Sequence, residues 1–391
     1  MLRTLYLVSY YFAPLGRADG VNRALLARGL VRRGWRVEVV QCENPSAPLR
    51  SFQRDPSLLE LLPDDVRRHP IRGWPWGPVG GLLQLAGLAR DPFGNWAGPA
   101  LKAARELVRR ERGWVVAIVP PATNLRVAFE LARETGLPLA LDFRDNVRGL
   151  PAAWVQACRA VFASTPRSLA DMLARYRLPP ARGRVVYNGY DEERGAVRRA
   201  DPPGGLRVVY TGLLNLDQDP ACLARALAQG HRPPAGGPRV RVDYYGPENY
   251  YTRWLLPRHL SAEVRFHGYL PYQAALAEVA AADLGLVSLR PAGNAYRIPS
   301  KAIQYLGAGT PLLAVGPDGA LRDLVAGERL GLFCRHGQPR ALVEALEALA
   351  ADPRELQAMR ARVDAARARF ASGAQAGAFA DHLDARLAAR D

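Results

Sequence analysis

The chain has 391 residues, 49% of them hydrophobic, and a net charge of +16, which is typical of a globular protein with two domains. No apolar run approaches the ~20 residues that span a bilayer, which excludes a helical membrane-spanning protein. Residues 1–195 carry 29 basic and 18 acidic side chains, against 24 and 19 in residues 196–391, so the first half is the part that favours an anionic partner.

Strands and helices alternate along the first half of the chain. The expected strands are residues 4–9, 36–41, 115–119, 137–143, 160–164 and 184–188. Residues 20–34 place Val21, Leu25, Leu26 and Leu30 at near-helical spacing and end at a glycine, which predicts a helix. The first run, TLYLVS, has no small-residue cleavage site after it, so we interpret it as a buried strand and not as a secretory signal.

One segment interrupts the alternation. Residues 71–99 carry Trp74, Trp76 and Trp96 among many Gly, Pro and Leu residues, and the pattern is too broken for a regular core helix. An exposed apolar loop of this kind is typical of a membrane or binding contact. The alternative is a loop whose tryptophans fold under the domain as a small additional core, and the sequence leaves both readings open.

The second half repeats the strand–helix alternation. Its expected strands are residues 206–212, 240–246, 264–270, 284–289, 311–315 and 330–334. Apolar strands alternating with helices indicate parallel sheets covered on both faces, so we predict an α/β protein with two Rossmann-like domains. The charged and then Pro/Gly-rich stretch 191–210 indicates a linker. We therefore expect domains at 1–195 and 196–375, with the last helix, 376–391, as a candidate to pack back onto the first domain.

The cysteines and histidines give no sign of a metal site. Cys42, Cys158, Cys222 and Cys334 lie far apart and form no CxxC pair, which argues against zinc and against a disulfide framework. This usage predicts a reducing, cytoplasmic location. Nor are aromatic residues interleaved with basic ones as on a nucleic-acid platform, so nucleic acid is not an expected partner.

Two motifs of the first half lie where a strand ends. Gly16 and Gly20 form a turn before a helix, which suits an anion or a close substrate approach, although an ordinary strand–helix turn is the commoner case. The sequence LDFRDN places Asp142, Arg144 and Asp145 at the carboxyl end of a strand, the edge where ligands bind in open α/β sheets. A structural Asp–Arg pair is a serious alternative for Asp142. Because alternate residues of a strand face opposite ways, we favour Arg144 and Asp145 as functional.

The chain contains only two lysines, Lys102 and Lys301; every other basic residue is arginine. Pro299 and Ser300 suit a helix start, so Lys301 falls in the first turn, beside free backbone N–H groups. A cation there is unfavourable by itself but forms an anion site once a phosphate is added. Gln304 lies one turn later on the same face. An arginine would serve a surface position equally well, so we favour a functional Lys301 over a tolerated surface lysine.

These motifs together resemble the retaining GT-B glycosyltransferases of family 4. The resemblance runs over about residues 4–350. Several segments are similar to the family's sequence blocks and follow in the same order. They are YYFAPLGRADG, VPPATN with LPLALDFRD, STPRSLADML, VVYNGYD, VVYTGLL, FHGYLP, ADLGLVSL and IPSKAIQYLGAGTPLLAV. The resemblance implies a GT-B fold, in which two Rossmann-like domains face each other across a cleft. It also implies a nucleotide-diphospho-sugar donor on the second domain and an acceptor on the first.

The resemblance implies roles for single donor-side residues. Lys301 and the backbone near Gly212 would meet the diphosphate, and Gln304 stands where the family usually has a glutamate on the ribose hydroxyls. Tyr269 and Leu270 fall where main-chain groups usually meet the base.

On the first domain, Gly20 would let the loop approach the donor. Asp145 would orient or deprotonate the acceptor hydroxyl, and Arg144 would bind an anionic acceptor or phosphate. Arg297 is a second cation that would assist Lys301 at the donor.

The sequence departs from the family pattern at several positions. The usual acidic pair, eight residues apart, is Tyr296 and Gln304 here, and GLLNLDQDPACL lacks the usual Arg and Lys. The resemblance implies a metal-independent enzyme, so neither metal nor cofactor is expected. Two alternatives remain: a nucleotide-sugar 2-epimerase of the same fold, and a non-catalytic nucleotide-binding relative.

The expected partners follow from the transferase reading. They are the donor, a glycan, lipid-linked or small-molecule acceptor, and an anionic membrane met through the basic first half and residues 71–99. This places the protein in the cytoplasm or at the inner face of the cytoplasmic membrane.

Overall fold

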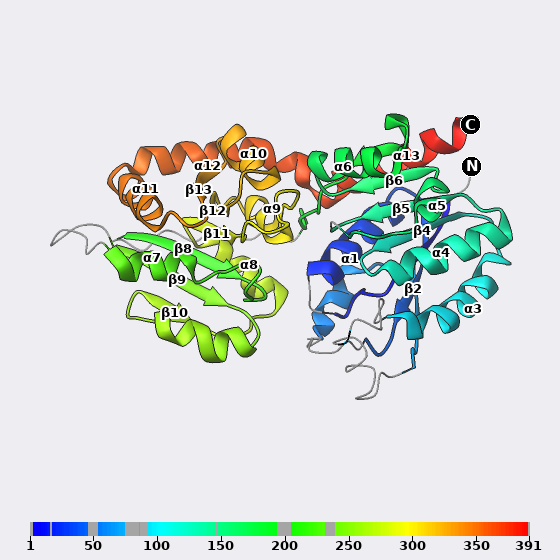
Figure 1. The fold of residues 1–391 in the computed structure, drawn as a ribbon, viewed down its shortest axis with the longest axis horizontal. Coiled ribbons are helices and arrows are strands. Elements are labelled where there is room, and N and C mark those ends of the chain that lie inside the picture. The colour runs from blue at the N-terminus through cyan, green and yellow to red at the C-terminus, as the bar shows by residue number, and fades with distance from the viewer. Residues whose placement is uncertain are drawn as a thin grey trace. The chain divides into compact units, whose positions relative to one another are not determined.

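The computed structural model places two parallel α/β sheets in two compact units of the chain (Figure 1). The structure describes residues 3–15, 18–45, 54–74, 86, 93–145, 147–193, 205–230 and 239–389. The first unit comprises Met1–Asn188 with Ser372–Asp391, and the second comprises Gly189–Ala371. No described helix is both long enough and apolar enough to cross a membrane.

The first unit contains a seven-stranded parallel sheet of order β3-β2-β1-β4-β5-β6-β7. Its strands are β1 (Thr4–Ser9), β2 (Arg36–Cys42), β3 (Val66–Ile71), β4 (Trp114–Val119), β5 (Leu139–Phe143), β6 (Ala160–Ala163) and β7 (Gly183–Val185). Its helices are α1 (Ala18–Val31), α3 (Ala97–Val108), α4 (Ala122–Thr135), α5 (Ala152–Gln156), α6 (Pro166–Tyr176) and α13 (Ser372–Ala388). Six of these strands were predicted; β3 was not. Only Val66 of β3 is buried, and the strand lies at the edge of the sheet, so it lacks the apolar run of the others.

The second unit contains a six-stranded parallel sheet of order β10-β9-β8-β11-β12-β13. Its strands are β8 (Gly205–Thr211), β9 (Arg239–Tyr245), β10 (Val264–Phe266), β11 (Leu284–Ser288), β12 (Leu312–Gly316) and β13 (Gly331–Arg335). Its helices are α7 (Cys222–Gly230), α8 (Tyr272–Ala280), α9 (Ser300–Gly307), α10 (Ala320–Gly327), α11 (Pro339–Ala351) and α12 (Pro353–Arg367). All six strands were predicted, although β10 ends before the expected residue 270.

The units divide earlier than the boundaries expected from composition, after residues 188 and 371 and not after 195 and 375. Tyr190 explains the first of these. Its backbone N–H donates to Phe370 O at 3.1 Å, and its ring lies against Gly307 of α9, where a Cβ would come within 2.2 Å of it. Tyr190 is therefore part of the second unit's packing, and the charged, Pro/Gly-rich stretch begins only after it.

Helix α13 packs on the first unit although it follows the second in sequence (Figure 1). The Phe379 ring stacks on Phe162 of β6 with centroids 3.9 Å apart. On α1, Gly29 faces Ala376, and a Cβ at Gly29 would lie 2.5 Å from the Ala376 Cβ. The missing side chain is what lets the two helices approach this closely.

The tryptophans of residues 71–99 do not all behave alike: one folds under the domain and another is exposed. Trp96 is fully buried, and its Nε1 donates to Ile71 O at 3.1 Å. Trp74 is 74% exposed, and Trp76 lies outside the described residues. The segment thus supplies one core anchor and one outward-facing aromatic side chain.

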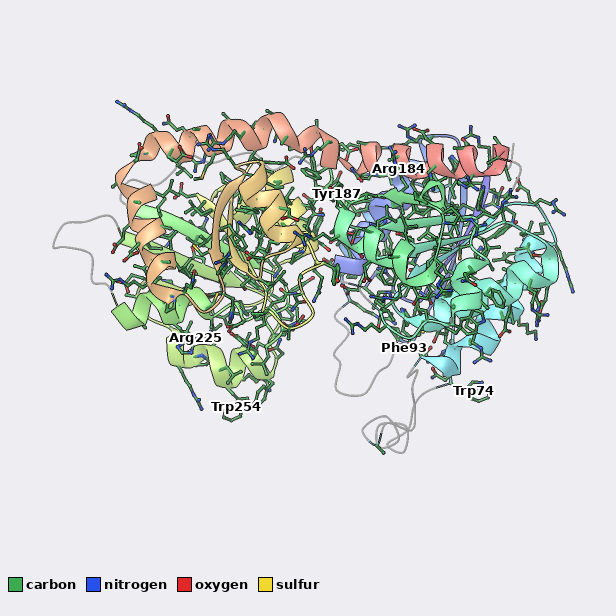
Figure 2. All side chains as sticks on the ribbon, turned by 45° about the horizontal axis from the view of Figure 1, so that its top comes forward. Trp74, Phe93, Arg184, Tyr187, Arg225 and Trp254 are labelled. Atoms are coloured by element: carbon green, nitrogen blue, oxygen red, sulfur yellow. The ribbon has the colours of Figure 1, made fainter. Side chains whose placement is uncertain are left out.

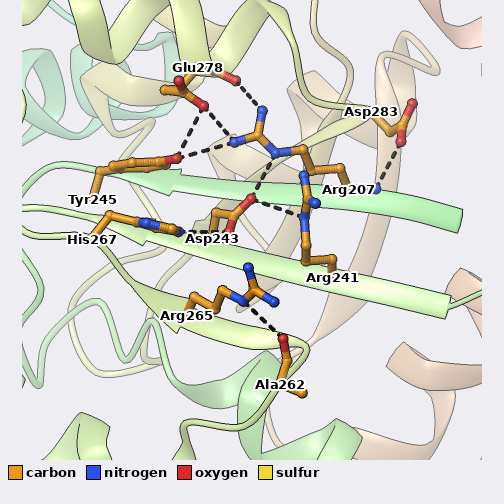
Figure 3. A network of polar contacts seen from close by, with 9 residues as sticks. All are labelled: Arg207, Arg241, Asp243, Tyr245, Ala262, Arg265, His267, Glu278 and Asp283. Atoms are coloured by element: carbon orange, nitrogen blue, oxygen red, sulfur yellow. Dashed lines mark hydrogen bonds and ion pairs between the residues drawn. The ribbon is translucent and has the colours of Figure 1, made fainter. Parts of the chain in front are cut away.

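A buried polar network fixes helix α8 to the second sheet (Figure 3). Arg207 of β8 donates to Asp243 Oδ2 at 2.7 Å and to Glu278 Oε2 at 2.6 Å. His267 Nε2 lies 2.8 Å from Asp243 Oδ1, and its ring stacks on Tyr245. Buried charges persist when they are paired, so the network also anchors the start of the loop that follows β10.

Replacing Gly29 by alanine should lower the free energy of unfolding by about 1–3 kcal/mol, because the new methyl group overpacks the contact with Ala376. Urea unfolding followed by circular dichroism measures this. Gly98→Ala in α3 is the matched control, since nothing lies within 4 Å of its Cβ position; it should be neutral or stabilising by up to about 1 kcal/mol. Equal effects of the two substitutions would contradict the close α1–α13 packing.

Candidate functional site

Three adjacent strands of the second sheet are each followed closely by a glycine at their carboxyl ends. Gly212 follows β8, Gly246 follows β9 and Gly268 lies just beyond β10. Gly212 and Gly268 have φ values of 105° and 80°, which favour glycine. A Cβ at Gly246 would lie 2.2 Å from Gly212 O. This edge is therefore bare backbone, and it adjoins the point between β8 and β11 where the strand order reverses, which is where ligands bind in open α/β sheets.

Lys301 reaches this edge from the first turn of α9. Its Nζ is buried without a hydrogen-bond partner and lies 3.4 Å from the centroid of the Tyr210 ring. A Cβ at Gly212 would lie 3.7 Å from Nζ. Burial, and after it the positive charge of Arg297, hold the pKa of Lys301 well below its ordinary value. The amine is thus placed at the glycine edge with no anion of the described chain to pair with it.

Arg297 is not available in the same way. Its Nη1 donates to Asp217 Oδ2 at 2.8 Å and to Asn294 Oδ1 at 2.9 Å, and Asn294 Nδ2 donates to Asp217 Oδ1 at 3.0 Å. Asp217 belongs to the loop after β8, where the resembling family usually has cations. The Asp217 carboxylate therefore already pairs with the Arg297 guanidinium, which we expected to assist Lys301.

Gln304 makes a hydrogen bond from each end of its amide. Its Nε2 donates to Gly189 O at 2.9 Å, and Oε1 accepts from the Tyr272 hydroxyl at 2.8 Å. A glutamate could not donate to the Gly189 carbonyl, so the chain's own packing accounts for an amide at this position. Tyr272 begins α8, and sequence reasoning missed it because its partner lies on a different helix.

The remaining donor-side residues surround this edge. Ser300 is half-buried at the start of α9. Tyr269, which is 37% exposed, and the half-buried Leu270 follow the positive-φ Gly268, directly beyond the His267 anchor. The structure thus gathers Gly212 from the loop after β8, Arg297 from the loop before α9, and Lys301 from α9 itself.

The charged motif of the first unit is arranged differently from the expectation. β5 ends at Phe143, and Arg144 turns back so that its Nε donates to Asp142 at 2.9 Å and its Nη1 to Val186 O at 3.0 Å. Arg144 and Asp142 therefore lie on the same side, as residues two apart along an extended chain do, so strand alternation gives no reason to separate this pair. Asp145 is half-buried one residue further on.

The glycine turn is described only in part. Gly20 lies in the first turns of α1, where a Cβ would come within 2.1 Å of Leu15 O. The chain's own backbone therefore requires glycine there. Gly16 lies outside the described residues.

The described residues contain no group of three or more His, Cys, Asp or Glu side chains that could hold a metal ion. The four cysteines are free.

Comparison with known proteins places this second unit in a family. Residues 205–352 match the family described as glycosyl transferases, group 1. The matched residues lie within the second unit, which is therefore the part of the chain that is similar to this family. The match covers β8 to α11 and includes Gly212, Lys301 and Gln304. The sequence matches no curated protein at a significant level.

Solved structures extend the likeness in fold to the whole chain. Sucrose-phosphate synthase from Thermosynechococcus elongatus has a TM-score of 0.75 and 18% identity, covering 99% of this chain and 100% of that one. HepE from Anabaena in complex with UDP-glucose has a TM-score of 0.69 and 16% identity, covering 98% and 99%. A glycosyltransferase from Rickettsia africae has a TM-score of 0.69 and 11% identity, covering 100% of both chains. The expected GT-B fold, with two Rossmann-like domains, is confirmed.

Lys301 should make the free energy of unfolding depend on pH. Its pKa is lowered in the folded protein, so between that value and about 10.4 the unfolded chain binds one more proton than the folded one. The lysine's contribution then makes the unfolding free energy rise with pH across this window. Lys301→Met should remove that slope and stabilise the protein at neutral pH. Urea unfolding at several pH values below 9.5 measures both; parallel curves for the two proteins would contradict the buried, unpaired amine.

Proposed function

We propose that this protein is a glycosyltransferase that moves a sugar from a nucleotide-diphospho-sugar to a hydroxyl of a glycan, lipid-linked or small-molecule acceptor, with retention and without a metal ion. The single observation that carries the donor class is the buried, unpartnered Nζ of Lys301 at the glycine edge. A diphosphate supplies the anion that this amine lacks. The structure of HepE with UDP-glucose supports the same class of donor.

Transfer breaks the bond between the anomeric carbon and the diphosphate oxygen, and the electron pair leaves with the diphosphate. Charge on that oxygen must be stabilised as it develops. Lys301 and the positive end of the α9 dipole supply this, since a helix N-terminus attracts anions. The acceptor hydroxyl bonds to the anomeric carbon, and its proton passes to the departing diphosphate oxygen.

The other residues take supporting roles in this proposal. The main chain at Tyr269 and Leu270 meets the base, and Gln304 with Tyr272 meets the ribose. Asp145 orients the acceptor hydroxyl. Arg144, held by Asp142 and Val186, shapes the acceptor side and is less free to bind an anion than the sequence suggested.

The cellular setting belongs to the same proposal. A lipid-linked acceptor at the inner face of the cytoplasmic membrane would suit the basic first half of the chain, and the exposed Trp74 lies in the segment expected to touch lipid. An epimerase of the same fold would turn over donor without any acceptor, so incubating donor alone separates the two activities.

The amine should bind nucleoside diphosphate and take up a proton as it does so. Calorimetry with UDP, GDP, ADP and TDP should show one tight ligand, with affinity reduced about 10- to 100-fold in Lys301→Ala, since a hydrogen bond to a charged group contributes about 1.5–3 kcal/mol. Repeating the titration near pH 8 in buffers of different ionisation enthalpy should reveal proton uptake by the wild type only.

Lys102→Ala is the matched control for that titration, because Lys102 is the other lysine of the chain and is exposed on α3. It should bind like the wild type. Absence of binding by the wild type would favour the non-catalytic relative. Tight binding that survives Lys301→Ala would show that the phosphates lie elsewhere.

The ribose contact can be tested by a double comparison. If Gln304 bonds the ribose hydroxyls, then removing them from the ligand and replacing the side chain by leucine should each weaken binding about tenfold, and together should weaken it little more than either alone. Affinities of UDP and 2′,3′-dideoxy-UDP, or the corresponding pair for whichever base binds, for wild type and Gln304→Leu supply the four values. Fully additive losses would refute the contact.

A further inference from the structure

One short helical segment of the second unit turns aromatic side chains outward. It comprises η4 (Tyr251–Leu255) and η5 (Leu256–His259), with Tyr250 at its start in helical conformation. Tyr250 is 67% exposed and Trp254 is 64% exposed. Figure 2 shows the Trp254 side chain pointing away from the ribbon. Exposed large aromatic residues of this kind are typical of interaction sites.

The segment is one π-helical turn followed by one 3-10 turn, and burial divides its residues into two sides. Tyr250, Arg253, Trp254, Pro257 and Arg258 are all exposed. We call these five residues the aromatic–arginine face.

The opposite side of the segment is firmly attached to the unit. Tyr251, Thr252 and Leu256 are buried. The Tyr251 hydroxyl accepts from Ala221 N at 3.1 Å, and Thr252 Oγ1 accepts from Asn249 N at 2.8 Å. The aromatic side chains are therefore held outward by a packed segment, not by a fraying end.

The charge of the face selects its partner. It carries two arginines and no acidic residue. Glu248, next to the face, forms an ion pair with Arg253 at 3.1 Å. Both side chains are about two-thirds exposed, so solvent screens the pair and it is weak. Arg253 and Arg258 are thus available to external anions. Trp and Tyr side chains favour the headgroup level of a bilayer, and nearby arginines are attracted to anionic lipids.

We propose that the aromatic–arginine face docks the second unit onto an anionic lipid surface. Tyr250 and Trp254 enter the headgroup region while Arg253 and Arg258 meet lipid phosphates. The net charge of +16 adds a general attraction to the same surface. This contact lies on a different unit from residues 71–99, and it does not depend on the donor chemistry proposed above.

Vesicle co-sedimentation of the full chain tests the proposal. We expect binding to vesicles containing 30% phosphatidylglycerol, little binding to pure phosphatidylcholine, and weakening as salt rises. Tyr250→Ser with Trp254→Ser should lower the partition coefficient about tenfold. Arg253→Gln with Arg258→Gln should lower it about 25-fold, at about fivefold for each arginine.

Two control variants isolate the face. Arg340→Gln with Arg354→Gln removes the same charge from exposed sites on α11 and α12 of the same unit and should have a much smaller effect. Trp74→Ser removes the exposed tryptophan of the first unit. All variants should keep the circular dichroism spectrum and nucleoside diphosphate binding of the wild type. Vesicle binding that is unchanged in both face variants would overturn the proposal, and so would a face that binds a protein or a glycan but no lipid.

Discussion

The amine of Lys301 is buried over the ring of Tyr210 without an anionic partner among the described residues, and the neighbouring structure is built around that placement. Gly212 leaves room beside Nζ because it has no side chain. The Tyr305 hydroxyl, one turn along α9, accepts from Thr211 N at 2.8 Å and so ties the end of β8 to the helix that carries the lysine. Burying a charged group is costly unless it is paired. A buried lysine amine at this position is therefore best explained by an anionic ligand that binds beside it.

The strands were predictable wherever both faces of a sheet are covered, because such strands are continuous apolar runs. β1, β4, β5 and β11 are buried at every position, and each was found from the sequence. β3 was missed because an edge strand needs only a few buried side chains, and its pattern does not differ from a loop. The unit boundary was placed too late because composition shows where the chain becomes polar, whereas Tyr190 packs on Gly307 before that point.

The candidate site was predictable in part. Lys301 stood out in the sequence because arginine occupies nearly every other basic position, and the structure places its amine at the glycine edge. Asp217 and Tyr272 could not be found in this way, because each acquires its meaning only when the fold brings it to Arg297 or Gln304. Arg144 shows a different difficulty: it lies two residues after Asp142, and residues two apart along an extended chain share a face, so alternation could not separate the two side chains.

Helix α13 has a consequence for the order in which the chain folds. It is synthesised after all of the second unit, yet Phe379 and Ala376 pack in the first unit on β6 and α1. Domains commonly fold as they leave the ribosome, with the N-terminal one first. Here the first sheet emerges early but must wait, with the face around Phe162 uncovered, until the second unit has been made. The strands and covering helices of the second unit are contiguous in sequence, so this unit can be the first to complete its core. The uncovered face of the first unit, around Phe162, is where a chaperone would bind during synthesis.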